Sequence, residues 1–166
     1  MIETDVATIE SCILEGDGSC RDITMDDVDV QRAREIVSFL LRTYTLTRSI
    51  NREGEELAFG ASIALVEAEF LKTENTLLIY MESGTELISR LQITLHWQNL
   101  QEVSWELTIF PEVVRRPFSL KLFKEFLDPI LIIAQPEMYF VRYENGSWRY
   151  GDTSKEGGVI YWERRA

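Results

Sequence analysis

The side chains that most often perform chemistry in enzymes are scarce in this chain. It has one histidine, His96, and two cysteines, Cys12 and Cys20, among 166 residues. A Ser-His-Asp or Cys-His arrangement would have to use His96, which an alternating pattern places on the polar side of a strand. A nucleophilic cysteine would need a nearby base and a lowered pKa, and the sequence indicates neither. We therefore predict that the protein is not an enzyme.

Carboxylates are plentiful, and they gather in two short stretches. The first stretch holds Asp26, Asp27 and Asp29, and the second holds Glu53, Glu55 and Glu56. Such clusters commonly form a solvated face or favour the positive end of a helix dipole. The functional alternative is a negatively charged surface for a basic protein, and we predict these six residues as partner-binding. An enzyme that uses scattered carboxylates is a third possibility.

No metal or cofactor site is predicted. The acidic stretches lack the ordered ligand spacing of a calcium or magnesium site, and two cysteines with one distant histidine do not make a zinc site. Gly16-Asp17-Gly18 lacks the following Gly and Lys of a phosphate-binding loop, and Gly157-Gly158 precedes a strand rather than a helix. An aromatic run between 139 and 162 could stack bases, but the charge of the chain favours core or interface packing.

Composition restricts the class of protein. The net charge is −11, and 45% of the residues are hydrophobic. A chain with this much negative charge is repelled by nucleic-acid phosphates and anionic membranes, and it attracts a basic partner. The alternative is that the charge only keeps the protein soluble. The N-terminus lacks the features of a secretory signal and no apolar run is long enough to span a bilayer, so a cytoplasmic protein with 1–166 as a single domain is expected. Cys12 and Cys20 could close a small disulfide loop, but reduced thiols are expected in that compartment.

The strongest structural pattern lies between residues 75 and 110. Apolar and polar residues alternate there with a period of two, which indicates half-buried strands. The predicted strands are Leu77–Met81, Glu86–Trp97 and Val103–Phe110. Pairing Met81 with Leu87, and Trp97 with Val103, places the apolar residues of all three on one face. The pattern predicts an antiparallel meander with 77–81 inside the sheet.

The first half of the chain gives weaker signals. Residues 5–14 favour a strand, and Thr24 is typical of the N-cap of a helix over 25–44, with Asp26 and Asp27 in its first turn. Residues 45–56 are polar and predict a loop. Residues 57–71 fit a helix face and a strand almost equally, and their alanines favour the helix.

The second half predicts a further helix and more strands. Ser119 can cap a helix that kinks or ends near Asp128, because Pro129 removes a backbone donor. Strands are predicted over 138–143 and 159–162, with a hairpin turn at 145–146, a returning segment at 148–150 and a loop over 151–158. The fold class is therefore α+β: an antiparallel sheet (the meander 75–110 plus C-terminal strands) packed against two or three helices.

The C-terminal half shows a family resemblance, which covers about a third of the chain. Its residues are an aromatic-rich helix at Phe118–Phe126, then Pro136–Val141 (PEMYFV), then Gly158–Trp162 (GVIYW). This order resembles bacterial polymorphic-toxin immunity proteins, in particular the immunity protein fifty-two family. Gly158 and Tyr161 match the Gly-Trp-x-Thr-Tyr strand of that family, whereas its Trp and Thr are absent here. The resemblance implies a small cytoplasmic protein that binds and blocks a cognate toxin, and it transfers no binding residues.

Two functions from different classes follow. The first is a non-enzymatic immunity protein that covers the active site of a toxin through an acidic and aromatic surface. The second is an acidic secretion chaperone, a class whose members are commonly dimers and hold an extended effector segment. The sequence leaves open whether the protein is a monomer or a homodimer, and it does not identify the partner.

Overall fold

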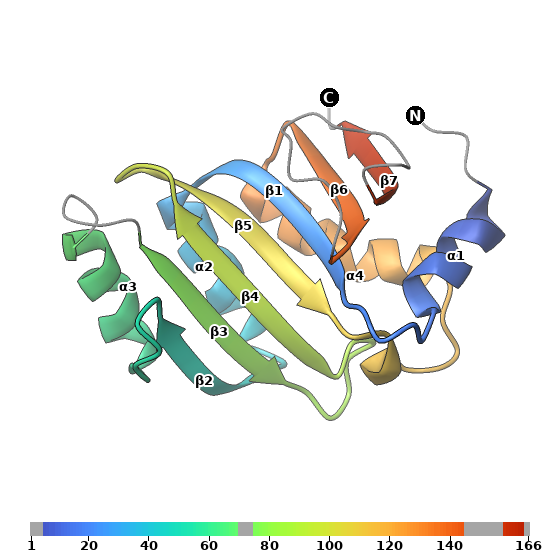
Figure 1. The fold of residues 1–166 in the computed structure, drawn as a ribbon, viewed down its shortest axis with the longest axis horizontal. Helices are drawn as coiled ribbons and strands as arrows, with labels where there is room; N and C mark the ends of the chain where they lie inside the picture. The colour runs from blue at the N-terminus through green and yellow to red at the C-terminus, as the bar shows by residue number, and fades with distance from the viewer. Residues whose placement is uncertain (1–4, 70–74, 145–157, 165–166) are drawn as a thin grey trace.

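The described part of the chain forms one seven-stranded antiparallel sheet with four helices packed on it (Figure 1). The structure is a computed structural model that describes residues 5–69, 75–144 and 158–164. The strands are β1 (Arg21–Asp29), β2 (Thr45–Asn51), β3 (Thr76–Glu82), β4 (Arg90–Trp97), β5 (Glu102–Ile109), β6 (Met138–Tyr143) and β7 (Val159–Arg164). The helices are α1 (Val6–Leu14), α2 (Val30–Leu40), α3 (Phe59–Glu69) and α4 (Leu120–Ala134). The strand order is β2-β3-β4-β5-β1-β6-β7.

The predicted meander is confirmed as β3, β4 and β5, and one of its two predicted pairings is correct. Trp97 does pair with Val103. Met81 pairs with Leu91 rather than Leu87, because β4 begins only at Arg90. The four-residue difference is an even number, so the apolar residues still face the same side. The interior position of β3 is also confirmed, since it lies between β2 and β4.

The predicted helix over 25–44 is wrong at both ends. Residues 21–29 form β1, which is inserted between β5 and β6, and Thr24 lies in that strand rather than at a helix N-cap. The cap of α2 is Asp29, whose Oδ1 accepts hydrogen bonds from the backbone N–H groups of Gln31 and Arg32 at 2.8 and 3.2 Å. The helix ends at Leu40, and Tyr44 beyond it is buried.

Two further elements differ from the predictions for the first half. Residues 6–14 form helix α1 rather than a strand, because Asp5 caps the first turn and Ile9 and Ile13 fall on one buried face. Residues 45–51 form the edge strand β2 rather than a loop. Its sequence is polar because only Ser49 and Ile50 of its seven residues are buried, and the other five are exposed or partly exposed. The unpredicted α1 raises the number of helices above the two or three expected.

The remaining helices and strands agree more closely with the sequence. Residues 59–69 are helical, as the alanines favoured, and Ser119 caps α4 by accepting the N–H of Leu122 at 3.2 Å. That helix does not end at Asp128. It continues through Pro129 to Ala134, with Ile130, Leu131 and Ala134 buried. Strands β6 and β7 are confirmed, whereas the predicted turn at 145–146, the returning segment 148–150 and most of the loop 151–158 lie outside the described residues.

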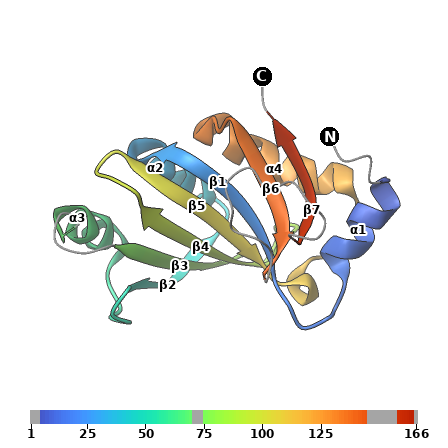
Figure 2. The same cartoon turned by 45° about the horizontal axis from the view of Figure 1, so that its top comes forward.

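The helices lie on the same side of the sheet (Figures 1 and 2). Helices α2 and α4 pack against each other behind the central strands, α3 packs on β2 and β3, and α1 packs against α4 and β7. The largest side chains in this core are fully buried and include Trp97, Trp105, Phe123 and Tyr139. No helix of the described residues covers the opposite side of the sheet.

Candidate functional site

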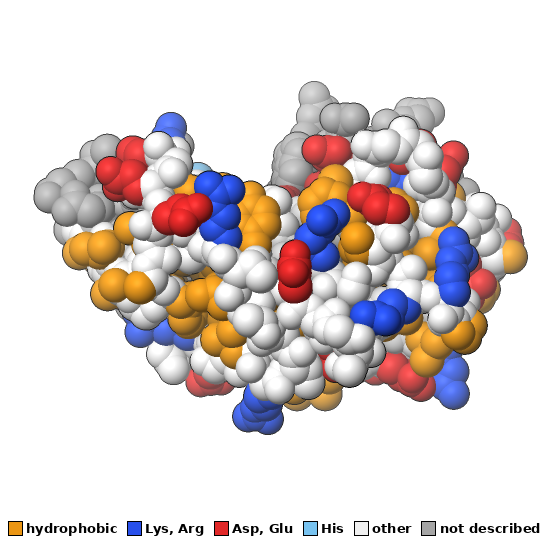
Figure 3. All heavy atoms as spheres, turned by 90° about the horizontal axis from the view of Figure 1, so that it is seen from below, with side chains coloured by type: hydrophobic (Ala, Val, Ile, Leu, Met, Phe, Trp, Pro, Cys, Tyr) orange, Lys and Arg blue, Asp and Glu red, His pale blue; other side chains and the backbone are white. Residues whose placement is uncertain are grey.

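The side of the sheet opposite the helices is the broadest surface available for a partner, and we call it the open face. Its side chains alternate with the buried core residues along each strand. They include Leu78, Tyr80, Gln92, Thr94, His96, Ser104, Glu106, Thr108, Asp22, Thr24, Phe140 and Arg142. Seen from below (Figure 3), the surface carries basic and acidic side chains interspersed with hydrophobic ones. The residues of this face on β3 and β4, together with Ser104 and Glu106 of β5, are partly exposed, whereas those on β1 and β6 and Thr108 are buried.

Two carboxylates lie close together in the middle of the open face. Register places Asp22 of β1 opposite Thr108 of β5, and it places Thr24 opposite Glu106, so the two acids are diagonal neighbours. Asp22 is 4% exposed, and its Oδ1 accepts a hydrogen bond from Thr108 Oγ1 at 2.8 Å. Thr108 Oγ1 is 3.5 Å from Glu106 Oε1, at the outer limit of a hydrogen bond. The hydroxyl group of Thr108 therefore donates its one proton to Asp22 rather than to Glu106.

The surroundings of Glu106 favour its neutral form. Burial is the main cause, repulsion by Asp22 comes second, and together they raise the pKa of Glu106 from 4.5 to about 7. Burial likewise raises the pKa of Asp22, although the Thr108 hydrogen bond opposes that effect. Arg142 of β6 lies opposite Asp22, with its guanidinium carbon 4.4 Å from the centre of the Phe140 ring. The two acids are thus partly desolvated, with the Arg142 guanidinium acting on Glu106 and the Arg21 guanidinium acting on Asp22.

The first predicted acidic stretch is split between two roles. The β1–β5 register shifts between Met25 and Val28, and within this bulge Asp27 has a φ of 54°. Asp26 accepts a hydrogen bond from Ser104 at 3.1 Å, and Asp27 is exposed, with a pKa raised by burial and then by Asp26 and Glu102. Neither lies in the first turn of a helix, as the sequence had predicted.

Asp26 and Asp27 line a hollow of about 200 Å³ together with residues 135–138 and Phe140. Asp29 caps α2, so its carboxylate already has a structural role.

Two residues of the second acidic stretch, Glu55 and Glu56, interact with side chains of the neighbouring strand β2. The stretch follows β2 in a turn where Gly54 has a φ of 85°, and the backbone N–H of Gly54 donates to the carbonyl of Asn51. Glu55 receives a hydrogen bond from the Asn51 side chain at 2.9 Å, and Glu56 pairs with Arg48 at 2.5 Å. Glu53 and Glu55 line a second hollow near Leu57 and Asn75.

The structure does not bring the two acidic stretches together. Strands β1 and β2 run in the same direction, so both stretches lie toward the same end of the sheet, but β3, β4 and β5 separate them. At about 4.8 Å between neighbouring strands, that separation is roughly 19 Å. One protein partner of ordinary size could reach both, and the role of these six residues stays a prediction.

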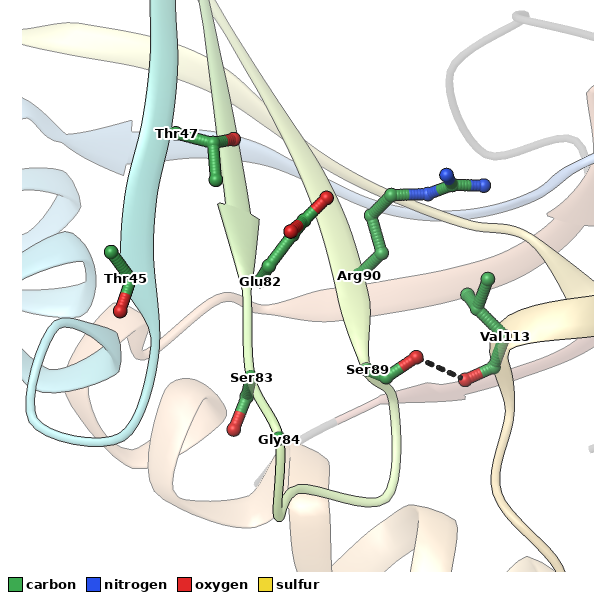
Figure 4. A pocket seen from close by; sticks show the side chains of 8 residues that line it. All are labelled: Thr45, Thr47, Glu82, Ser83, Gly84, Ser89, Arg90 and Val113. Carbon is green, nitrogen blue, oxygen red and sulfur yellow. Dashed lines mark hydrogen bonds between the residues drawn. The ribbon is translucent and has the colours of Figure 1, made fainter.

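Another hollow in the described residues lies where β3 ends and β4 begins (Figure 4). It encloses about 480 Å³ and is lined by Thr45, Thr47, Glu82, Ser83, Gly84, Ser89, Arg90 and Val113. Its polar groups do not converge: Ser89 donates to the backbone carbonyl of Val113 at 3.0 Å, and Arg90 turns away toward Phe110 and Glu112. This arrangement does not resemble a catalytic pocket, in which polar groups point at one reacting position.

The histidine and the cysteines have ordinary surroundings. His96 lies on the open face, as its alternation predicted, and its Nδ1 is 3.0 Å from Thr76 Oγ1. Cys12 and Cys20 are free, and burial raises the pKa of Cys20 to about 11, which disfavours a thiolate. Within the described ranges, no three His, Cys, Asp or Glu side chains are grouped so that they could hold a metal ion. None of the described helices has the length and apolar character needed to cross a membrane.

Sequence reasoning missed Asp22, Thr24 and Glu106 as site residues. Glu106 was recognised only as a polar position in the alternation of the third predicted strand, and Thr24 was assigned to a helix cap. The missing information was the position of β1, since Asp22 and Thr108 are 86 residues apart in the sequence. A charged residue at a mid-strand position, surrounded by apolar neighbours, was the available signal.

Comparisons with known proteins do not assign this chain to a family. No protein-family model and no curated protein matches the chain. A chain in the crystal structure of the toxic C-terminal tip of CdiA from Pseudomonas aeruginosa in complex with its immune protein aligns with a TM-score of 0.49 and 12% sequence identity. The alignment covers 89% of the present chain and 97% of that chain. Membership of the immunity protein fifty-two family stays a prediction.

Proposed function

We propose that this protein is a non-enzymatic immunity protein, which binds a cognate bacterial toxin and neutralises it by covering a functional surface. The observation that carries the proposal is the open face. Seven strands of up to nine residues offer a surface about 29 Å wide and about 27 Å long, or on the order of 800 Å². A protein–protein interface of standard size takes about that area from each partner.

The chemistry of the open face supports a protein ligand. Tyr80 and Trp162 are partly exposed and provide aromatic contacts, and Gln92 and Thr94 provide polar contacts between them. Aromatic anchors within a polar surround are typical of protein interfaces. The net charge of −11 adds long-range attraction to a basic partner. We take a toxin as that partner because the C-terminal half of the sequence resembles immunity proteins.

The test is a binding and protection experiment with the C-terminal domain of the secreted protein encoded next to this chain in its native genome. We expect a complex of defined stoichiometry by size-exclusion chromatography with light scattering, weaker binding at high salt, and survival of cells that express the toxin domain. The toxin domain of an unrelated system is the matched control. No complex with the neighbouring domain, or equal binding of both domains, would contradict the proposal.

The same experiment separates this role from that of a secretion chaperone. A chaperone would bind an extended segment of the neighbouring protein and leave its folded toxin domain unbound. Titration with the isolated toxin domain and with the unfolded segment that precedes it distinguishes the two. We expect binding of the folded domain only.

A further inference from the structure

The acidic pair on the open face is short of hydrogen-bond donors. Glu106 has Thr108 Oγ1 as its nearest donor among the described residues, at 3.5 Å, and that hydroxyl already donates to Asp22 at 2.8 Å. A partly buried carboxylate ordinarily has closer donors, because an unsatisfied charged group is costly to desolvate. Glu106 is therefore placed where a ligand that carries N–H groups would be stabilised.

A second, independent feature points to the same position. Thr24 lies directly opposite Glu106 on the neighbouring strand and is 6% exposed. Its Oγ1 is buried and has no hydrogen-bond partner within the described ranges. Buried hydroxyl groups in native proteins are usually paired, so this one also indicates that a polar ligand group completes the site.

The charge of the surroundings selects the ligand. Three carboxylates lie near one another here, from Asp22 of β1, Glu106 of β5 and Glu144 just after β6: Asp22 and Glu144 both raise the pKa of Glu106, and Glu144 also raises that of Asp22. Arg142 is the guanidinium that acts on Glu106 from β6, and its effect is smaller than those of burial and of Asp22. A cation with several N–H donors satisfies both the charge and the missing hydrogen bonds.

On the basis of the proposed function, we propose that Asp22, Thr24 and Glu106 form the site on the open face that receives a cationic side chain, arginine or lysine, from the toxin. Glu106 is partly exposed and lies on β5, the middle strand of the sheet, which fits this role because strongly contributing residues cluster near the centre of interfaces. Arginine suits the site best, since its fork of donors can bind the Glu106 carboxylate and the Thr24 hydroxyl together.

The site can be tested without the toxin. The probe is N-acetyl-argininamide, added to the ¹⁵N-labelled full chain and followed by NMR, and N-acetyl-citrullinamide is its neutral isostere. We expect saturable shifts of the backbone amides of Thr24, Glu106 and Arg142 with the arginine probe, with a dissociation constant roughly in the millimolar range. Because the bound cation favours ionised Glu106, the affinity rises between about pH 6 and about pH 8.

Two variants sharpen the test. Glu106→Gln keeps the shape of the side chain and removes its charge, so we expect the affinity for the arginine probe to fall about tenfold or more, with loss of the pH dependence. Glu82→Gln removes an exposed carboxylate elsewhere on the open face and should leave both unchanged. The proposal would be overturned if the arginine probe caused no amide shifts, or if the citrulline probe caused shifts as large as those of the arginine probe. It would also be overturned if the arginine probe shifted the amides of the wild type and of Glu106→Gln equally.

Failure of this inference is distinguishable from failure of the proposed function. If the toxin domain binds the wild type and Glu106→Gln with equal affinity, the protein is an immunity protein and the cationic-site inference is wrong. If the arginine probe binds as described but no toxin domain does, the site exists and the immunity role is wrong. Circular dichroism of each variant confirms that the fold is intact.

Discussion

The carboxylate of Glu106 should lower the stability of the free protein above neutral pH, and Glu106→Gln should relieve that cost. The pKa of Glu106 is about 7 in the folded protein against 4.5 for the ordinary side chain. The folded protein therefore binds more protons than the unfolded chain between these values, and the free energy of unfolding falls as the pH rises through this window. Below about pH 4 the side chain is neutral in both states and contributes no difference.

The size of the effect follows from the shift. At about 1.4 kcal/mol for each unit, the upper limit at about pH 8 is about 3 kcal/mol. Because Glu106 is only partly buried, solvent screening reduces the expected value to about 1–2 kcal/mol. For a chain of this size that corresponds to a rise in melting temperature of roughly 2–8 °C in the variant.

The assay is urea unfolding of the wild type, Glu106→Gln and the control Glu82→Gln at about pH 4 and about pH 8. We expect Glu106→Gln to be more stable than the wild type at the higher pH, almost equal to it at the lower pH, and the control to match the wild type at both. A Glu106→Gln variant that is no more stable at about pH 8 would show that the carboxylate is well solvated, and the reasoning about the open face would fail.

Three further substitutions test interactions that stabilise the fold, each by urea unfolding against the wild type. Arg21 is fully buried and donates hydrogen bonds to the backbone carbonyls of residues 12, 15, 19 and 20. Arg21→Met should therefore lower the free energy of unfolding by about 3–5 kcal/mol, and a decrease under about 1 kcal/mol would contradict this role. Asp29→Ala should cost about 1 kcal/mol because it removes the cap of α2, with Asp29→Ser as the variant that keeps most of the stability. Tyr44→Phe should cost about 1 kcal/mol because it removes the buried hydrogen bond from the Tyr44 hydroxyl to the Ile88 carbonyl at 2.7 Å, and an unchanged stability would show that bond to be unimportant.

The parts of the fold that were predicted correctly are those in which local pattern and tertiary environment agree. Strands β3, β4 and β5 bury one side only, so their alternation is visible in the sequence and the meander follows from it. The capping serine of α4 has an equally local signal. Both features depend on residues close together in the chain.

The errors have a different origin. Thr24 and Asp26 have the residue types of a helix start, but the strand pairing of β1 with β5 and β6 overrides that preference, and the true cap is Asp29. The polar sequence of β2 suits an edge strand, which resembles a loop when it is read alone. The site could not be predicted, because Glu106 acquires its properties from a strand that lies far away in the sequence.

The most direct test of the central claim, that the open face binds the folded toxin, is to block that face and measure the affinity. Thr94 lies at its centre, opposite Glu106, and Ile132 is 62% exposed on α4, on the other side of the molecule. Isothermal titration of the neighbouring toxin domain against Thr94→Trp and Ile132→Trp compares the two sides. We predict that Thr94→Trp weakens binding by about 100-fold or more while Ile132→Trp binds like the wild type; the reverse order, or equal affinities, would contradict the account.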